Sequence, residues 1–520
     1  TFTASVAFKN KFKFKSEYAP HVSFNLFESE KIHGLLIPKD IYDVLKQKNK
    51  LLFTKGNYLS NSGLVYSDKH SMETLNKYIE FVQVDFHDSI YGYCTDNAVM
   101  DIMTRYKKVN TIANGIIKRT LRDLTSENGE LAIINLSNYK YSGKILIETE
   151  KVLPDMFNAV KISSRKGFTD KKLYNINEIP ITEDITEINT YLIDVKDIPP
   201  FSLTKITSDK LCSQSYLKRG ENFIENEYIK LEIKNNKLIA ANKVLREIYR
   251  DFITIKDRTD VGDSYNFGAL KSDAGTFGEI KSYKTQKAGG IKAELNVAYE
   301  ITLNGKKCKL AIDFILYNQS KMVQARINWA NKCKNHLLQV GFNLKEKITK
   351  TKSEDLFTTV ERTFNPDYNI YEHIPAKKGV ELEVNTAPMQ RFVNAQNLTL
   401  ITKGISEYEI NQNTLYLTIL RASGIISNPS NPCRGTSAGP PVDTPKLQCL
   451  GENKVDFAFA FTNDEQTMYE LAEEFYYPCV SLFTDKSNKI FLIPKGRVYA
   501  VTNENGKLVE RVYSDELKNI

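Results

Sequence analysis

The chain has 520 residues, of which 41% are hydrophobic and 11% aromatic, which is typical of a globular protein with roughly two to four domains. Its 71 basic and 63 acidic residues give a net charge of +8, and the lysines are spread along the chain without a long basic tract. This distribution argues against a nucleic-acid-binding protein, and the absence of any run of 18 apolar residues argues against a membrane span.

The N-terminal segment, residues 1–70, has a mixed pattern and is left unassigned. Within it, residues 8–15 alternate phenylalanine with lysine. Such alternation is compatible with base stacking on aromatic side chains, but it is also the pattern of a half-buried strand. We favour the strand.

Two helices are predicted next along the chain. Apolar residues recur at helical spacing over residues 75–82 and again over 99–117. Thr95 or Asp96 is placed to cap the second helix. A short connection between the two patterns would therefore be held by two rigid helices, a setting in which functional residues are often found.

Beyond about residue 130 the period of the apolar pattern changes to two. Residues 228–241 alternate on both sides of a turn at 234–237, which predicts a β-hairpin. Further strands are predicted at 131–136, 142–148, 292–301, 308–317, 322–329 and 337–344. One helical pattern, at 465–475, interrupts them. So many short strands separated by turn residues predict a large antiparallel sandwich.

The predicted fold is multi-domain and mainly β, with a helical bundle followed by a small β domain and a large antiparallel β-sandwich. A connection at Pro199 and Pro200 marks one domain boundary. The predicted domains are the unassigned segment 1–70, the helical domain 71–127, the small β domain 128–205 and the sandwich domain 206–520.

The cysteines give a weak indication of the compartment. There are seven, an odd number, and none forms a C-x-x-C pair, so the sequence predicts neither a disulfide framework nor a zinc ribbon. This pattern favours the reducing cytoplasm. The chain begins at Thr1 without an initiator methionine, which predicts a processed product or a fragment.

A histidine and an aspartate lie side by side in the connection between the two helical patterns, in the segment FHDSIYG at residues 86–92. A neutral imidazole can ligate a metal or share a proton, and the adjacent carboxylate can bind a polar ligand. From spacing alone, His87 and Asp88 are better interpreted as a pair that stabilises a loop.

Two later segments also have both structural and functional interpretations. Residues 260–265 contain aspartates and a glycine, which are ordinary turn residues. The stretch 428–441 is the richest in proline, glycine and serine. It is either an exposed loop in which Arg434 is solvated or an ordered loop whose backbone approaches a ligand. We expect the loop to be exposed, so that Arg434→Ala leaves the fold intact.

Four segments together resemble glycoside hydrolase family 38, the α-mannosidases, and they occur in the same order as in that family. They are FHDSIYG at 86–92, DRTDVGDSYNF at 257–267, NTAPMQRFV at 385–393, and LRA at 420–422 with CRGTSAGP at 433–440. The resemblance implies the family's helical middle domain and C-terminal β domains for this chain.

The resemblance also implies roles for four residues. His87 matches one of four ligands to the family's zinc ion, and Asp88 matches a contact to the sugar. Imidazole nitrogen and carboxylate oxygen are ordinary zinc ligands, and zinc can polarise hydroxyl groups of a bound sugar. Tyr265 matches a tyrosine facing the sugar pocket, and Arg434 matches an arginine that reaches back to the active site.

A retaining glycosidase also needs two carboxylates about 5 Å apart, a nucleophile and an acid/base. The family carries them, with the other zinc ligands, on an N-terminal barrel, whereas only 86 residues precede His87 here and none of their segments matches. The catalytic carboxylates are therefore unknown and are expected outside this chain, with residues 1–70 as the end of the barrel.

The resemblance thus implies the C-terminal part of a zinc-dependent retaining α-mannosidase that hydrolyses α-linked mannose of oligosaccharides or glycosides. Its partners would be a mannose-containing carbohydrate and the missing barrel, and a homo-oligomer is compatible with the sequence. The alternatives are a non-catalytic carbohydrate-binding β-sandwich protein and a purely structural partner subunit.

Overall fold

A computed structural model describes residues 92–168, 185–212, 215–273, 275–303, 306–355, 358–494, 496–504 and 507–513. The predicted strand at 8–15 and the first predicted helix lie outside these ranges. The chain divides into two compact units, one of Thr1–Leu124, Val442–Thr444 and Pro494–Ile520, and the other of Thr125–Pro441 and Pro445–Ile493.

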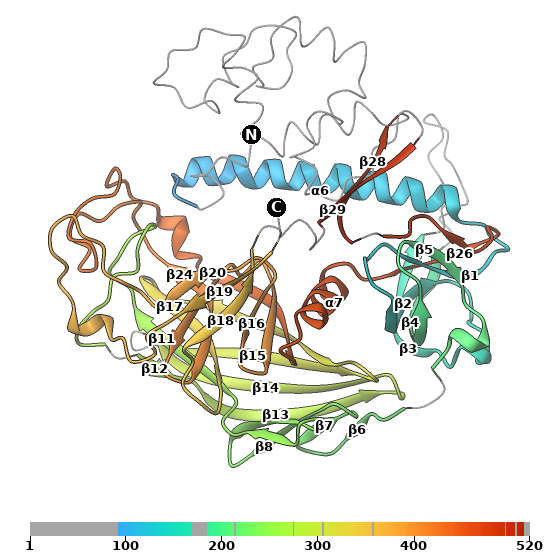
Figure 1. Ribbon diagram of the computed structural model, residues 1–520, viewed down its shortest axis with the longest axis horizontal. Helices are drawn as coiled ribbons and strands as arrows, with labels where there is room; N and C mark the ends of the chain where they lie inside the picture. Colours follow the sequence, from blue (N-terminus) through green and yellow to red (C-terminus); the bar gives the residue numbers. More distant parts are fainter. Residues whose placement is uncertain are drawn as a thin grey trace, which may run out of the picture. The chain divides into compact units, whose positions relative to one another are not determined.

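The described part of the first unit contains one long helix and one hairpin. Helix α6 spans Asp96–Leu124, as the helical pattern at 99–117 predicts (Figure 1). Thr95 caps it, since its hydroxyl oxygen accepts a hydrogen bond from Ala98 N at 3.4 Å. Strands β28 (Arg497–Glu504) and β29 (Lys507–Tyr513) pair antiparallel.

The second unit begins with two small sheets, which we call the small β region. One sheet has the order β2-β4-β3 and the other the order β26-β1-β5-β27. Their bounds are β1 Glu130–Asn135, β2 Tyr141–Thr149, β3 Val160–Phe168, β4 Ile185–Ile198, β5 Ser202–Lys205, β26 Val480–Thr484 and β27 Lys489–Ile490. The small β region therefore takes strands from both sides of the predicted boundary at 205/206, and the boundary itself stays a prediction.

A five-stranded sheet follows, with the order β10-β9-β8-β7-β6. Its bounds are β6 Lys218–Arg219, β7 Phe223–Glu225, β8 Ile229–Lys234, β9 Lys237–Asn242 and β10 Glu247–Tyr249. Strands β8 and β9 form the hairpin predicted at 228–241, with Lys234 opposite Lys237. Asn235 and Asn236 form its tip with φ of 52° and 54°, values that asparagine adopts more readily than most residues.

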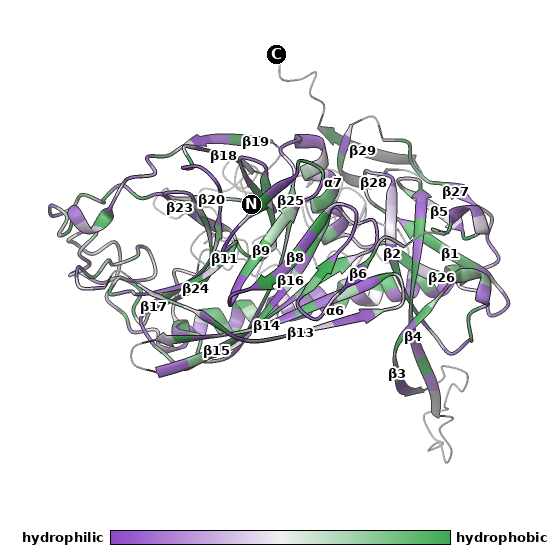
Figure 2. Cartoon of the chain, turned by 90° about the horizontal axis from the view of Figure 1, so that it is seen from below, coloured by the Kyte–Doolittle hydropathy of each residue, from purple (hydrophilic) through white to green (hydrophobic). Residues whose placement is uncertain are grey.

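The largest sheet has nine strands in the order β13-β14-β15-β16-β25-β22-β21-β18-β19. Its bounds are β13 Glu279–Ala288, β14 Lys292–Leu303, β15 Lys306–Tyr317, β16 Met322–Asn331, β18 Lys350–Glu354, β19 Thr359–Thr363, β21 Phe392–Ala395, β22 Leu398–Lys403 and β25 Gly451–Phe461. Every second residue along most of β15 and β16 is buried. Figure 2 accordingly shows both hydrophobic and hydrophilic residues in the strands of this sheet. The three strands predicted at 292–329 are confirmed.

A six-stranded sheet, with the order β12-β11-β17-β24-β23-β20, carries the candidate site. Its bounds are β11 Ile253–Thr259, β12 Thr276–Phe277, β17 His336–Asn343, β20 Thr386–Pro388, β23 Glu407–Asn411 and β24 Thr414–Ala422. One hydrophobic core joins it to the nine- and five-stranded sheets, for instance through the rings of Phe252, Phe342 and Phe459. The predicted mainly β fold with an antiparallel sandwich is confirmed.

Helix α7 (Glu465–Tyr476) confirms the helix predicted at 465–475. Asp464 caps its N-terminus by accepting a hydrogen bond from Thr467 N at 2.9 Å. Its buried face packs on residues of the nine-stranded sheet such as Phe392 and Ala458, outside the main core. Short 3-10 helices lie at Asp155–Phe157, Ser208–Lys210, Ile370–Glu372 and Pro445–Gln448. No helix in the described ranges is both long enough and apolar enough to cross a membrane.

Candidate functional site

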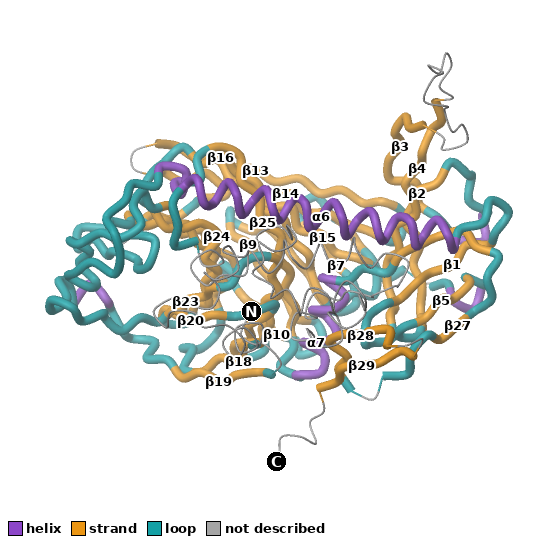
Figure 3. Tube along the Cα trace, turned by 90° about the horizontal axis from the view of Figure 1, so that it is seen from above, coloured by secondary structure: helices purple, strands orange, loops and turns teal. Residues whose placement is uncertain are grey.

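The sequence-predicted site residues fall into two groups. His87 and Asp88 lie outside the described residues. Tyr265 follows β11 and Arg434 follows β24, so both belong to loops at one end of the six-stranded sheet. Figure 3 shows loop segments gathered beside β24. The structure brings these two loops together.

The first loop is wound tightly around the carboxylate of Asp260. Its Oδ1 accepts hydrogen bonds from Gly262 N at 2.8 Å and Gly268 N at 2.9 Å, and its Oδ2 accepts one from Arg421 Nε at 2.9 Å. A Cβ atom at Gly262 would lie 2.1 Å from the carbonyl oxygen of Asn266, so only glycine fits the turn. The aspartate therefore joins the loop to β24.

The second aspartate, Asp263, joins this loop to the one that carries Arg434. It accepts hydrogen bonds from Tyr265 N at 3.0 Å, Asn266 N at 2.9 Å and Asn428 N at 2.7 Å. It also forms an ion pair with Arg434 Nη2. Asp263 is 0% exposed and Arg434 is 3% exposed, so the ion pair is buried.

The expectation that Arg434 is a solvated residue of an exposed loop is wrong. Its Nε donates to Thr436 O at 2.8 Å, and its Nη1 donates to Asn266 Oδ1. A buried carboxylate such as Asp263 requires a cationic or hydrogen-bonding partner, and Arg434 provides both. The arginine is therefore part of the structure that holds the two loops together.

The proline- and glycine-rich loop is ordered by side chains that bind backbone groups. Ser427 Oγ accepts hydrogen bonds from Ala438 N at 2.8 Å and Gly439 N at 3.1 Å. Asn431 donates to Asn266 O at 3.1 Å and accepts from Cys433 N at 2.9 Å. The loop is therefore ordered, as the second interpretation predicts, and the approach of its backbone to a ligand stays a prediction.

Tyr265 lies against this ordered loop. A Cβ atom at Gly439 would lie 3.0 Å from the hydroxyl oxygen of Tyr265, so the ring sits close to the backbone there. The backbone of Tyr265 is anchored by Asp263, and its side chain is partly exposed. The buried ion pair thus positions a partly exposed tyrosine whose hydroxyl can donate and accept hydrogen bonds.

A layer of buried charge beneath the loops was not predicted from the sequence. His336 Nδ1 lies 2.6 Å from Asp257 Oδ1, and His336 Nε2 lies 3.1 Å from Asn331 Oδ1. Burial raises the pKa of Asp257, and the bond to His336 opposes this shift. The only sequence signal for this layer was the run of charged residues at 256–258 in β11. The same run is also compatible with an ordinary half-buried strand.

The same layer contains an ion pair between Arg258 and Glu409. Gln339 supports it, because its Nε2 donates to Glu409 Oε2 at 2.9 Å and its Oε1 accepts from Arg258 Nη2 at 2.9 Å. Burial acts to raise the pKa of Glu409, but Arg258 and Gln339 outweigh it and hold that pKa below its usual range.

A metal site needs several ligating side chains close together. Within the described ranges, no group of three or more His, Cys, Asp and Glu side chains is arranged to hold a metal ion. A four-coordinate zinc site built on His87 would therefore need at least one further ligand from residues outside the described ranges.

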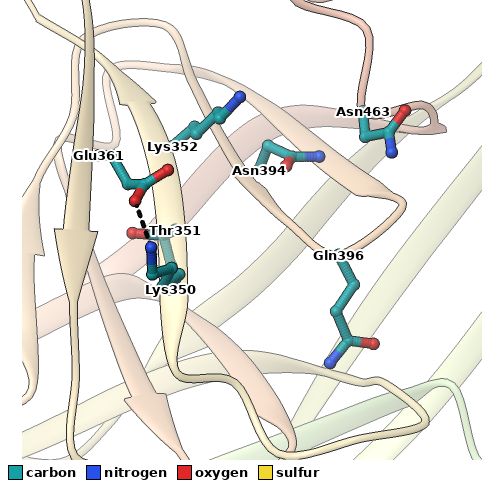
Figure 4. Close-up of a pocket in the computed structure, with 7 residues that line it drawn as sticks. All are labelled: Lys350, Thr351, Lys352, Glu361, Asn394, Gln396 and Asn463. Atoms are coloured by element: carbon teal, nitrogen blue, oxygen red, sulfur yellow. Dashed lines mark hydrogen bonds and ion pairs between the residues drawn. The ribbon is translucent and has the colours of Figure 1, made fainter.

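A separate polar cavity of about 230 Å³ lies on the nine-stranded sheet (Figure 4). It is lined by Lys350, Thr351, Lys352, Glu361, Asn394, Gln396 and Asn463. Lys350 pairs with Glu361 at 2.7 Å, and both amide hydrogens of Asn394 are directed to protein acceptors. Because β19 is the edge strand of this sheet, we interpret these charges as protection of the edge against further strand pairing.

Comparison with known proteins gives the family of the central part of the chain. Residues 224–424 match the model of the glycosyl hydrolases family 38 C-terminal domain. This stretch is therefore similar to a family 38 C-terminal domain. Residues 224–424 contain β8–β24, and hence every strand of the six-stranded sheet, together with Asp263 and Tyr265, whereas Arg434 lies beyond them. The family resemblance noted on the sequence is thereby confirmed.

Solved structures share the fold over most of the chain, a longer part than the residues 224–424 that match the family model. An α-mannosidase from Enterococcus faecalis V583 superposes with a TM-score of 0.68 at 18% identity and covers 87% of this chain. A glycosyl hydrolase family 38 protein from Enterococcus faecalis gives a TM-score of 0.66 at 18% identity and covers 85%. At this level of identity the likeness shows the fold.

A curated relative matches a shorter stretch. It is the "Putative mannosylglycerate hydrolase" of Halalkalibacterium halodurans, which is 26% identical over 152 residues, or 28% of this chain. The chain spans 59% of each enterococcal structure and 15% of the length of this relative.

Proposed function

We propose that this chain is the C-terminal part of a zinc-dependent, retaining α-mannosidase that hydrolyses α-linked mannose from oligosaccharides or glycosides. The observation that carries the proposal is the convergence of two of the four segments that resemble the family. Asp260 and Asp263, from residues 257–267, bind Arg421 and Arg434, which lie on β24 and in the following loop. Residues 161 and 171 positions apart in the sequence thus meet, and Asp260, Asp263 and Arg421 lie within the family match.

In this proposal the two loops form one wall of a sugar pocket. The hydroxyl of Tyr265 would exchange hydrogen bonds with a sugar hydroxyl, and Asp88 would accept hydrogen bonds from others. Arg434 would act as a positioning residue, since its donors already bind Asp263, Asn266 and Thr436. This differs from the direct sugar contact that the resemblance implies for Arg434.

We further propose that His87 ligates zinc together with residues of an N-terminal barrel, which would also carry the nucleophile and the acid/base. A zinc ion bound there would supply Lewis-acid polarisation of sugar hydroxyls. The barrel, a mannose-containing carbohydrate and a second copy of the chain are the proposed partners. The proposed compartment is the cytoplasm, with which the seven free cysteine thiols are compatible.

The isolated 520-residue chain provides the first test. A single imidazole cannot close a four-coordinate zinc site, so dialysed chain is expected to retain much less than one zinc per molecule. It is also expected to cleave an aryl α-mannoside no faster than background, because the two carboxylates are missing. Elemental analysis and a chromogenic assay measure both. Stoichiometric zinc or robust hydrolysis would contradict the proposal that the ligands and the nucleophile lie elsewhere.

Tyr265→Phe in the protein that includes the barrel is the second test. Loss of one hydrogen bond to the sugar is expected to lower kcat/KM for an aryl α-mannoside by about tenfold, or ~1.4 kcal/mol. The melting temperature should stay unchanged, because the ring and the backbone anchor remain. Tyr283→Phe on β13, which is exposed, serves as the matched control. Equal kcat/KM in the two variants would remove Tyr265 from the site.

A further inference from the structure

The polar cavity on the nine-stranded sheet has no role in the proposed function (Figure 4). On β21, Val393 belongs to the main core, so the next residue, Asn394, points to the opposite face of the sheet. On β18, the hydroxyl of Thr351 lies 2.7 Å from that of Tyr408 in the core, so Lys352 also points to the opposite face. The nine-stranded sheet therefore separates the cavity from the six-stranded sheet, which carries the candidate site.

Lys352 lies at the centre of the cavity wall. It is directly opposite Glu361 of β19 and Asn394 of β21, and Figure 4 shows its side chain between theirs. The carboxylate of Glu361 nevertheless pairs with Lys350, whose Nζ lies 2.7 Å from Glu361 Oε1. Among the described residues, the ammonium of Lys352 has neither an ion-pair partner nor a hydrogen-bond acceptor. A half-buried cation in this state is available to a ligand.

Asn394 is a buried member of the cavity wall. It is 5% exposed, and its Nδ2 donates to Leu398 O at 3.0 Å and to Thr462 O at 2.9 Å. These bonds use both amide hydrogens and hold the side chain in one orientation, in which Oδ1 remains available as an acceptor. At the rim, Asn463 is exposed, and its side-chain amide has no partner within the described ranges. The cavity thus offers a fixed acceptor next to free donors.

The chemistry of the lining determines which class of ligand fits. Lys352 supplies donors, whereas Glu361 and Asn394 supply acceptors. An anion would be repelled by the carboxylate and a cation by the two lysines, but a hydroxyl group both donates and accepts hydrogen bonds. The volume of about 230 Å³ corresponds to roughly eight waters of ~30 Å³ each, which is enough for one sugar ring. The cavity therefore fits a small neutral ligand with several hydroxyl groups.

We propose that this cavity is a non-catalytic binding site for a single neutral sugar unit. The ammonium of Lys352 would donate to two neighbouring hydroxyl oxygens, while Glu361 Oε2 and Asn394 Oδ1 would accept hydrogen bonds from two hydroxyl groups. The site is independent of the proposed function, because it needs neither zinc nor the barrel. The isolated chain contains all of the residues that line it.

Saturation-transfer NMR of the 520-residue chain with methyl α-mannopyranoside tests the site. The titration is expected to give a dissociation constant of roughly 1–10 mM, because a few solvent-exposed hydrogen bonds to one sugar ring support only weak binding. Lys352→Met removes the central donor and should weaken binding about tenfold, since hydrogen bonds to charged groups are the stronger ones. Asn463→Trp, at the exposed rim, should block the cavity without disturbing the core.

Two control variants and one competitor make the outcome decisive, with melting temperatures to check that each variant is folded. Lys309→Met, at an exposed position of β15 in the same sheet, should bind the mannoside like the wild type. Tyr265→Phe should also leave this affinity unchanged. A signal that is lost in Tyr265→Phe but kept in Lys352→Met would mean that the sugar binds at the candidate site, which would overturn the cavity proposal and leave the proposed function intact. Absence of a saturable signal in the wild type, or equal competition by inorganic phosphate, would overturn it as well.

Discussion

Arg434→Ala is expected to lower the free energy of unfolding by about 3–5 kcal/mol, the cost of leaving a buried charge without its partner. The variant would leave the Asp263 carboxylate fully buried with only hydrogen-bond donors around it. It would also remove the bond that ties the second loop to Asn266 of the first loop, and the bond to Thr436 O within the second loop. Thermal and urea unfolding of the chain measure the effect.

Arg421→Ala is the matched control for this prediction. Its partner Asp260 keeps two backbone donors, Gly262 N and Gly268 N, and the side chain of Arg421 is 20% exposed. We therefore expect a smaller loss, about 1–2 kcal/mol. The double variant Asp263→Leu/Arg434→Met should be more stable than Arg434→Ala, because it buries no charge. If Arg434→Ala unfolded like the wild type, the buried ion pair could not hold the loops together.

Asp194→Asn is expected to stabilise the chain by about 2–3 kcal/mol at pH 7.5. Asp194, on β4, is buried, its Oδ2 accepts a hydrogen bond from Asn318 Nδ2 at 2.8 Å, and its Oδ1 has no partner among the described residues. Burial raises its pKa from 3.8 to about 6, with Glu227 acting in the same direction and Asn318 and Lys144 opposing. An asparagine keeps the bond to Asn318 and carries no charge.

The pH dependence of this effect has a definite sign. Because the folded pKa lies above the unfolded value, the ionised carboxylate destabilises the fold at pH above about 6. That cost disappears as the pH falls from about 6 towards 4, so the difference between Asp194→Asn and wild type should shrink to near zero there. Unfolding measured between pH 4 and 8 tests this. Asp197→Asn, on the same strand but exposed, should show little change. A stability difference that is independent of pH would contradict the assignment.

The sequence predicted the elements whose periodicity is strong. The hairpin of β8 and β9, strands β14 to β17 and helix α7 all lie where alternation or helical spacing placed them. Each of these elements buries one face against a core that the same pattern encodes. The family resemblance likewise predicted that Tyr265 and Arg434 would belong to one region, and the structure brings their loops together.

The burial of Arg434 could not be predicted from its neighbours in the sequence. Proline, glycine and serine are common both in exposed loops and in loops ordered by side-chain hydrogen bonds. The deciding partner, Asp263, lies 171 residues away, and the resemblance did not assign it a role. The same holds for His336 and Asp257, which are 79 residues apart and pair only because β11 and β17 are neighbours.

The small β region has a consequence for the order in which the chain folds during synthesis. Strand β1 pairs with β26, and Asn138 N binds Glu473 Oε2 across 335 residues. The sheet β26-β1-β5-β27 therefore lacks its two outer strands until residues 480–490 have left the ribosome, and the edges of β1 and β5 stay open until then. Residues 224–424, which match the family 38 model, all emerge earlier. They can therefore pair most of their strands before residue 480 is synthesised. A chain stalled before residue 480 would present the unpaired edge of β1 to other strands and to chaperones.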